Sequence, residues 1–158
     1  MSDVINLIRL KQETNSQSLT ELEQQARERF ESLPLIIGCD WDDGSWSYLK
    51  SNQNIKFQAI GGGELPKELV TFCKVYLVNM LWTQRLRAEP YSVSHIRSSI
   101  EPIKIWAEMG FEELSDLNQE SYDANIVYLR ERYAEPATNG VSLNRVVTYL
   151  NDNHLLNA

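Results

Sequence analysis

The feature that most constrains this chain is a series of four amphipathic segments that fills its second half. In each segment apolar residues recur every three or four positions, which places them on one face of a helix. Short breaks rich in Pro, Gly and Asn separate the segments, so residues 65–156 are expected to form four helices with short connections. The first segment, residues 66–86, has the broadest apolar stripe, at Leu69, Phe72, Cys73, Tyr76, Leu77, Met80 and Leu81.

The second segment, "YSVSHIRSSIEPIKIWAEMG" at 91–110, has two distinct faces. Ser92 or Ser94 is suited to begin the helix, and Gly110 is suited to end it. Its apolar face is expected to point into the core, and it consists of Val93, Ile96, Ile100, Ile103 and Ala107.

The last two helices are predicted from the same kind of pattern. Asn118 or Ser121 can cap the third helix, and "AEPATNG" at 134–140 is expected to break the chain before the fourth helix begins at 141. The inward residues of the third helix are predicted to be Tyr122, Ile126, Leu129 and Tyr133. Those of the fourth helix are predicted to be Leu143, Val146, Val147 and Leu150.

Residues 1–63 have a different pattern. A short amphipathic helix is expected at 3–13, and a second helix follows from Ser18 or Thr20 up to Pro34. That second helix has a thin apolar stripe and should be exposed on most sides; the stripe is Leu19, Leu22, Ala26 and Phe30.

Residues 35–60 alternate aromatic and β-branched positions around the turn "KSNQN", which predicts short strands. The glycines at 61–63 then form a flexible joint. The sequence thus predicts a mainly α (α+β) fold with an N-terminal segment at 1–63 and a four-helix domain at 64–158. The aromatic side chains could stack on bases or pack in the core, and packing is expected for Trp41, Trp46, Tyr48, Phe57 and Trp106.

Charge and hydropathy restrict the partners of the chain. The net charge is −7 and neither half is basic, so any surface that binds an anion must be local. No apolar run approaches the roughly 20 residues of a membrane-spanning helix, and "MSDVINLIRLKQ" lacks the pattern of a secretory signal. We therefore expect a soluble cytoplasmic protein with no membrane partner.

Residues for catalysis or metal binding do not come together in the sequence. His95 and His154 are far apart, and neither has a neighbouring set of ligands. Cys39 and Cys73 lie in unrelated contexts, so a disulfide or zinc site is not expected, and Cys73 is predicted to be a buried thiol. No acid, base and nucleophile are grouped, so we expect no catalytic residues, no metal and no cofactor in this chain.

The polar face of the helix at 92–108 has two interpretations. Arg97 and Lys104 lie seven residues apart, two turns along one side of the helix, with serines beside them. They could contact phosphates, helped by the partial positive charge of the helix N-terminus. Alternatively Arg97 could pair with Glu101 and Lys104 with Glu108, which would leave only a solvated surface.

The order of segments from about residue 46 to 156 resembles a known family. An extended stretch ending in "IKFQAI" is followed by "LPKELVTFCKVYLVNML", "SVSHIRSSIEPIKIWAEMG", "FEELSDLNQESYDANIVYLRERY" and "GVSLNRVVTYLNDNHLL". This arrangement is similar to the core-binding domain of tyrosine recombinases, the phage integrase family. The catalytic residues of that family lie in a further C-terminal domain, and this sequence has no His-x-x-Arg and stops at Ala158, where that domain would start.

The resemblance implies a DNA-binding portion of a site-specific recombinase. Such a domain clamps duplex DNA for integration and recombination without catalytic residues of its own, and it can also meet other recombinase protomers. The DNA-binding residues that it implies are Ser92, Ser94, Arg97, Ser98, Lys104, Arg85, Arg87, Asn144 and Arg145. The alternative is an acidic helical module for protein–protein interaction, which would need an exposed apolar groove instead of a positive surface.

Overall fold

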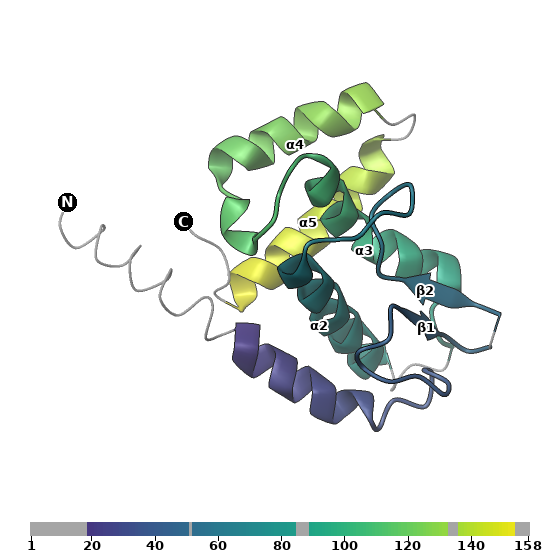
Figure 1. Cartoon of the computed structure of the whole chain (residues 1–158). Coiled ribbons are helices and arrows are strands. Elements are labelled where there is room, and N and C mark those ends of the chain that lie inside the picture. The colour runs from purple at the N-terminus through teal and green to yellow at the C-terminus, as the bar shows by residue number, and fades with distance from the viewer. Residues whose placement is uncertain (1–18, 51, 85–88, 133–135, 154–158) are drawn as a thin grey trace.

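The computed structural model describes residues 19–50, 52–84, 89–132 and 136–153, and their fold is mainly helical with one two-stranded antiparallel sheet, as predicted (Figure 1). The predicted helix at 3–13 and the candidates Arg85 and Arg87 lie outside the described residues. In chain order the elements are a helix at 19–30, β1 (Ser45–Ser47), β2 (Asn54–Lys56), α2 (Lys67–Gln84), α3 (Val93–Glu108), the 3-10 helix η1 (Leu114–Asp116), α4 (Gln119–Arg132) and α5 (Pro136–Asp152).

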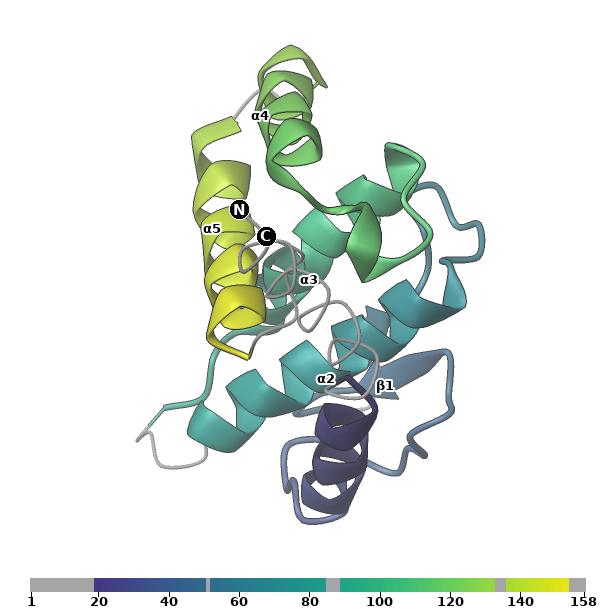
Figure 2. The ribbon, with the colours of Figure 1, turned by 90° about the vertical axis from the view of Figure 1, so that its left-hand side faces the viewer.

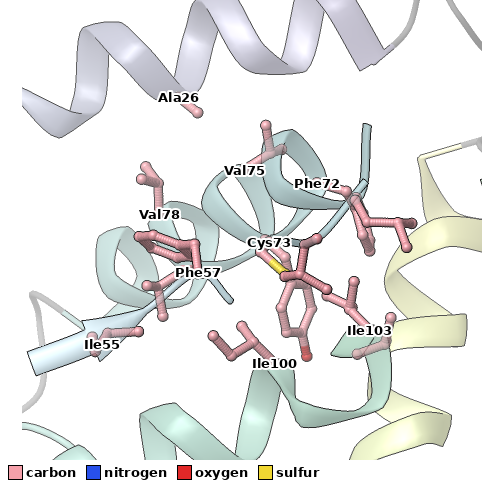
Figure 3. Close-up of a cluster of buried hydrophobic side chains, with 14 of the residues drawn as sticks. Ala26, Ile55, Phe57, Phe72, Cys73, Val75, Val78, Ile100 and Ile103 are labelled. Atoms are coloured by element: carbon pink, nitrogen blue, oxygen red, sulfur yellow. The ribbon is translucent and has the colours of Figure 1, made fainter. Parts of the chain in front are cut away.

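Helix α2 is the central element, and it is buried well beyond the single stripe that the sequence predicted. The helix at 19–30 covers one side of α2, while α3 packs on the other side (Figure 3). Val75 and Val78 are therefore as buried as the predicted stripe, because they lie beneath Ala26 and the hairpin. No helix in the described part of the chain is both long and apolar enough to cross a membrane.

The strands pair as an antiparallel hairpin, with Trp46 opposite Ile55. Both side chains are fully buried, and the Trp46 ring meets the rings of Phe30, Trp41 and Phe57. The prediction that this aromatic cluster packs in the core is confirmed.

Helix α3 begins and ends where the sequence indicated. Ser92 is its N-cap and accepts a hydrogen bond from the His95 N–H at 3.2 Å, and Gly110 follows the C-cap with a φ of +99°. The helix also packs on α5, so its buried face is wider than the predicted stripe and includes Trp106. The Trp106 Nε1–H donates to the buried Asn125 of α4 at 2.8 Å.

Helix α5 starts at Pro136, five residues before the predicted start at 141, so the expectation that 134–140 breaks the chain is wrong for 136–140. Proline suits the first turn of a helix, because its φ is already helical and its missing N–H would have no partner there. The four-helix arrangement of α2 to α5 is otherwise as predicted. Figure 2 shows α4 at the end of the molecule that lies farthest from β1.

Polar contacts join the hairpin to the helices. The buried Gln84 of α2 donates to the Tyr48 hydroxyl at 3.0 Å and accepts from the Tyr91 N–H at 2.7 Å. The Tyr48 hydroxyl in turn donates to the Tyr91 carbonyl at 2.7 Å. Buried side chains from both sides of residue 63 belong to one hydrophobic cluster, so the hairpin has a fixed position relative to α3.

The buried thiol of Cys73 predicts a loss of stability at alkaline pH. Burial raises the pKa of Cys73 from 9.0 to about 12, although the Lys104 and Lys74 amines oppose this shift. The pKa of this thiol is higher in the folded protein than in the unfolded chain. The free energy that the neutral thiol contributes to folding is therefore complete below pH 9 and is lost as the pH rises toward 12. Relative to Cys73→Ala, the wild type should lose about 1 kcal/mol by roughly pH 10.

Urea denaturation of both proteins over a series of pH values measures this difference. Near neutral pH the alanine variant should be the less stable of the two, because it leaves a small cavity. The difference in unfolding free energy between the two proteins should become smaller above pH 9, the unperturbed pKa of this thiol. A gap that is constant from neutral to alkaline pH would contradict a raised thiol pKa.

Candidate nucleic-acid interface

The polar face of α3 lies against the free edge of β2. In the hairpin, the Phe57 N–H donates to Gly44 at 3.0 Å and the Tyr48 N–H donates to Gln53 at 2.8 Å. Because backbone groups alternate in direction along a strand, the carbonyls of Asn54 and Lys56 must point away from β1. These two carbonyls form the edge that meets α3, and β2 is the strand of the pair that packs on α3 (Figure 1).

Arg97 and Lys104 complete this edge. The Arg97 Nε and Nη2 both donate to the Asn54 carbonyl oxygen, at 2.9 and 2.7 Å. The Lys104 Nζ donates to the Lys56 carbonyl oxygen at 2.7 Å. The two cations thus satisfy acceptors that an edge strand would otherwise expose, a contact that neither interpretation of the sequence included.

Three positive side chains come close together here, and we call Lys56, Arg97 and Lys104 the basic patch. Burial lowers the pKa of Lys104; Cys73 and Glu101 oppose this, and the charges of Arg97 and Lys56 lower the pKa further. Those two effects mean that the charges of Arg97 and Lys56 each lie near enough to Lys104 to repel its amine. The patch therefore gathers three positive side chains, with Glu101 also near Lys104, on a chain whose net charge is −7.

Arg97 keeps the capacity to bind an anion. Its side chain is exposed, and its two hydrogen bonds to Asn54 use two of the five guanidinium N–H groups. The other N–H groups of the fork can donate to a phosphate oxygen. Lys104, in contrast, is partly buried and directs its amine at the main chain of β2.

The serines of α3 differ in their environment. The Ser92 oxygen accepts the capping hydrogen bond, which leaves its hydroxyl hydrogen as a donor. Ser94 is exposed one residue inside the helix, and Ser98 is partly buried. These three residues place hydroxyl donors at the N-terminal half of the helix that carries Arg97.

The candidates on α5 are attached to other neighbours. The Asn144 Oδ1 accepts a hydrogen bond from the Tyr122 hydroxyl of α4 at 2.8 Å. Arg145 is exposed and lies close enough to Tyr76 of α2 to lower its pKa, against the larger raising effect of burial. The structure thus groups Arg97 and Lys104 with the hairpin, whereas Asn144 and Arg145 are positioned by α2 and α4.

Sequence reasoning missed the hairpin residues Asn54 and Lys56. The tripeptide "NIK" carried a signal, because a buried isoleucine between two polar residues places both polar side chains on the opposite face of a strand. The partner of those residues could not be foreseen, because α3 follows some 40 positions later in the chain.

Two further observations bear on the alternative functions. Within the ranges that the structure describes, no three His, Cys, Asp or Glu side chains group as a metal site. A hollow of about 780 Å³ between the helix at 19–30, the start of α2 and the loop at 112–113 is acidic rather than apolar. Its acidic residues are Glu23, Glu64, Glu68, Glu112 and Glu113.

The exposed large apolar residues lie on separate elements. Ile37 and Ile60 are in loops, Val127 is on α4 and Val141 is on α5, each between 43% and 51% exposed. Isolated apolar residues of this kind are normal on a protein surface and do not identify a docking groove.

No protein-family model matches this chain, and no curated protein or solved structure is significantly similar to it.

Proposed function

We propose that this chain binds the sugar–phosphate backbone of duplex DNA through the face that carries Arg97. In this proposal it is the DNA-binding portion of a tyrosine recombinase, and it clamps DNA for integration and recombination without catalytic residues of its own. The observation that supports DNA binding most directly is the basic patch, in which an exposed guanidinium is held in place and retains free donors.

The chemistry of the face suits phosphate. A guanidinium held at two points by one carbonyl has lost much of its conformational freedom, so binding a phosphate requires less further ordering. Serine hydroxyls and a helix N-terminus at Ser92 add donors and a partial positive charge. Such contacts position the protein on DNA and carry little sequence information.

The proposal assigns this chain to one half of a DNA clamp. The patch is local and the chain as a whole is acidic, so affinity for DNA should be weak, in the nonspecific range of roughly 10⁻⁴–10⁻⁶ M. In the recombinase family that the sequence resembles, a catalytic domain holds the other side of the duplex. Other protomers of the same recombinase are the second class of partner that this proposal includes.

Arg97→Glu tests the proposal. It should lower the affinity for unrelated duplexes and reduce the slope of log K against log salt by about 1, because one phosphate contact is lost. Arg130→Glu is the matched control, since it makes the same change of charge at an exposed position of α4, away from the hairpin (Figure 2). Fluorescence anisotropy with a labelled duplex at several salt concentrations measures both quantities.

Lys104 is left intact so that one of the two contacts that hold β2 remains when Arg97 is replaced, and a thermal melt checks the fold of each variant. Binding curves for Arg97→Glu that coincide with those of the control would exclude Arg97 as a phosphate contact. If the wild type itself binds no duplex at low salt, the acidic interaction module becomes the better explanation, with the acidic hollow as the surface to examine.

A further inference from the structure

We propose that the outer face of the β-hairpin continues the phosphate-binding surface, with Lys56 as a phosphate contact and Lys104 as the residue that positions it. This inference rests on the proposed function, because it assigns further residues to the same DNA-binding site. It also changes the role of Lys104, which the sequence grouped with Arg97 as a direct contact.

The side chains of β2 alternate between the buried face and the outer face of the hairpin. Ile55 is fully buried, so its neighbours Asn54 and Lys56 point to the opposite, outer face of the hairpin. The Ser47 hydroxyl lies 3.2 Å from the Asn54 Oδ1, which places the cross-strand pair on this same face. Ser45 stands opposite Lys56 in the register.

The strand residues on the outer face of the hairpin are polar or basic. They are two serines, an asparagine and an exposed lysine. The Ser47 hydroxyl donates to the Asn54 Oδ1, which leaves the Ser45 hydroxyl, the Asn54 amide and the Lys56 amine as donors for phosphate oxygens. None of these four positions is acidic. Asp42 and Asp43 border the hollow beside Lys56, so the surface open to phosphates ends at that turn.

Lys56 and Lys104 lie in different environments. The Lys104 amine is partly buried and one of its three N–H groups donates to the main-chain oxygen of Lys56, so the position of this amine is tied to β2. The Lys56 side chain is exposed and does not have this constraint. Lys104 therefore fixes the strand, and Lys56 presents its amine to solvent two residues along β2 from the Asn54 carbonyl that Arg97 binds.

Two anchoring points define the placement of β2 along α3. Arg97 binds the carbonyl of Asn54 and Lys104 binds the carbonyl two residues further on, so the strand can neither slide nor rotate without losing both contacts. The outer face of the hairpin and the exposed guanidinium thus form one continuous surface. Phosphate is the occupant that fits it, because its charge complements that of Lys56 and Arg97.

The test compares variants of the whole chain on one labelled duplex over a range of salt concentrations. Lys56→Glu should lower affinity roughly tenfold and reduce the salt slope by about 1, while Lys56→Gln should give a smaller loss of the same kind. Both should melt like the wild type, because the side chain is exposed. The control is Arg130→Glu, which should bind like the wild type.

Lys104→Met separates positioning from contact. It should speed amide hydrogen exchange in the hairpin and weaken binding, but its salt slope should stay that of the wild type, and Lys104→Arg should restore both properties. A reduced slope in Lys104→Met would instead make Lys104 a direct contact. DNA-binding curves for Lys56→Glu that match those of Arg130→Glu would contradict the role of the hairpin surface and leave the proposed contact at Arg97 standing. A wild type that binds no duplex would contradict the proposed function and this inference together.

Discussion

Ile100→Asp should lower the free energy of unfolding by about 3–5 kcal/mol, enough to unfold a large fraction of the protein. Ile100 is 1% exposed and points from α3 toward the buried side chains of α2 and β2 (Figure 3). A carboxylate there would lose its hydration without gaining a cationic partner. The helix would have to leave the core or the carboxylate would have to become protonated, and either change is unfavourable.

Thermal and urea denaturation followed by circular dichroism measure this effect. Val127→Asp is the matched control, since it introduces the same charge on the exposed side of α4 and should change stability by less than about 0.5 kcal/mol. Ile100→Val should be mild, at about 1 kcal/mol, because it removes only one methylene. A melting temperature unchanged by Ile100→Asp would mean that the face of α3 has been assigned incorrectly.

Lys74→Glu should be as damaging, again by about 3–5 kcal/mol. Lys74 is 5% exposed, and its amine donates to the Trp41 carbonyl at 2.5 Å. It also lies over the rings of Phe57 and Trp46, at 5.2 and 5.7 Å from their centres. Burial lowers the pKa of this amine, although the nearby carboxylate of Asp42 raises it.

A glutamate at this position would reverse every one of these interactions. Its carboxylate would face the carbonyl oxygen of Trp41 and the negative charge of Asp42, and it would meet the negative faces of two aromatic rings. Lys74→Met keeps the apolar stem and introduces no charge, so it should lose only about 1–2 kcal/mol, mainly through the unpaired carbonyl.

Unfolding should be followed by tryptophan fluorescence and by circular dichroism in the same samples. Two of the four tryptophans, Trp41 and Trp46, lie in the segment at 40–57, while Trp82 and Trp106 lie on α2 and α3. Circular dichroism reports mostly on the helices. Because one hydrophobic cluster spans both regions, the two signals should change together in the wild type and in Lys74→Met. A fluorescence change that clearly precedes the loss of helix would mean that the N-terminal segment unfolds as a separate unit.

The basic patch also explains how an exposed strand edge is protected. Edge strands carry unpaired backbone groups that can pair with another chain. In this protein the edge of β2 meets two cations from α3, each bound to a main-chain oxygen. The same two residues therefore stabilise the hairpin and create positive potential, which is why substitutions there must be checked for folding before binding is interpreted.

The sequence by itself determined that residues 65–156 contain the four helices α2 to α5, where α3 begins and ends, and that Ile96, Ile100 and Ile103 of its apolar face are buried. These properties depend on local spacing, on the capping serine at Ser92 and on the glycine at Gly110, all of which lie within the segment concerned. Local alternation likewise predicted short strands around a turn, and the strands β1 and β2 form there with Trp46 buried, as expected.

Only the tertiary structure decided what the polar face of α3 contacts. Arg97 and Asn54 are 43 residues apart, and Lys104 and Lys56 are 48 residues apart. Periodicity shows that such a face avoids the core, but a polar face can meet solvent, a ligand or a strand edge equally well. Which of these occurs depends on how distant segments pack around α2, and that packing buries Lys74 and directs two cations of α3 to the backbone of β2.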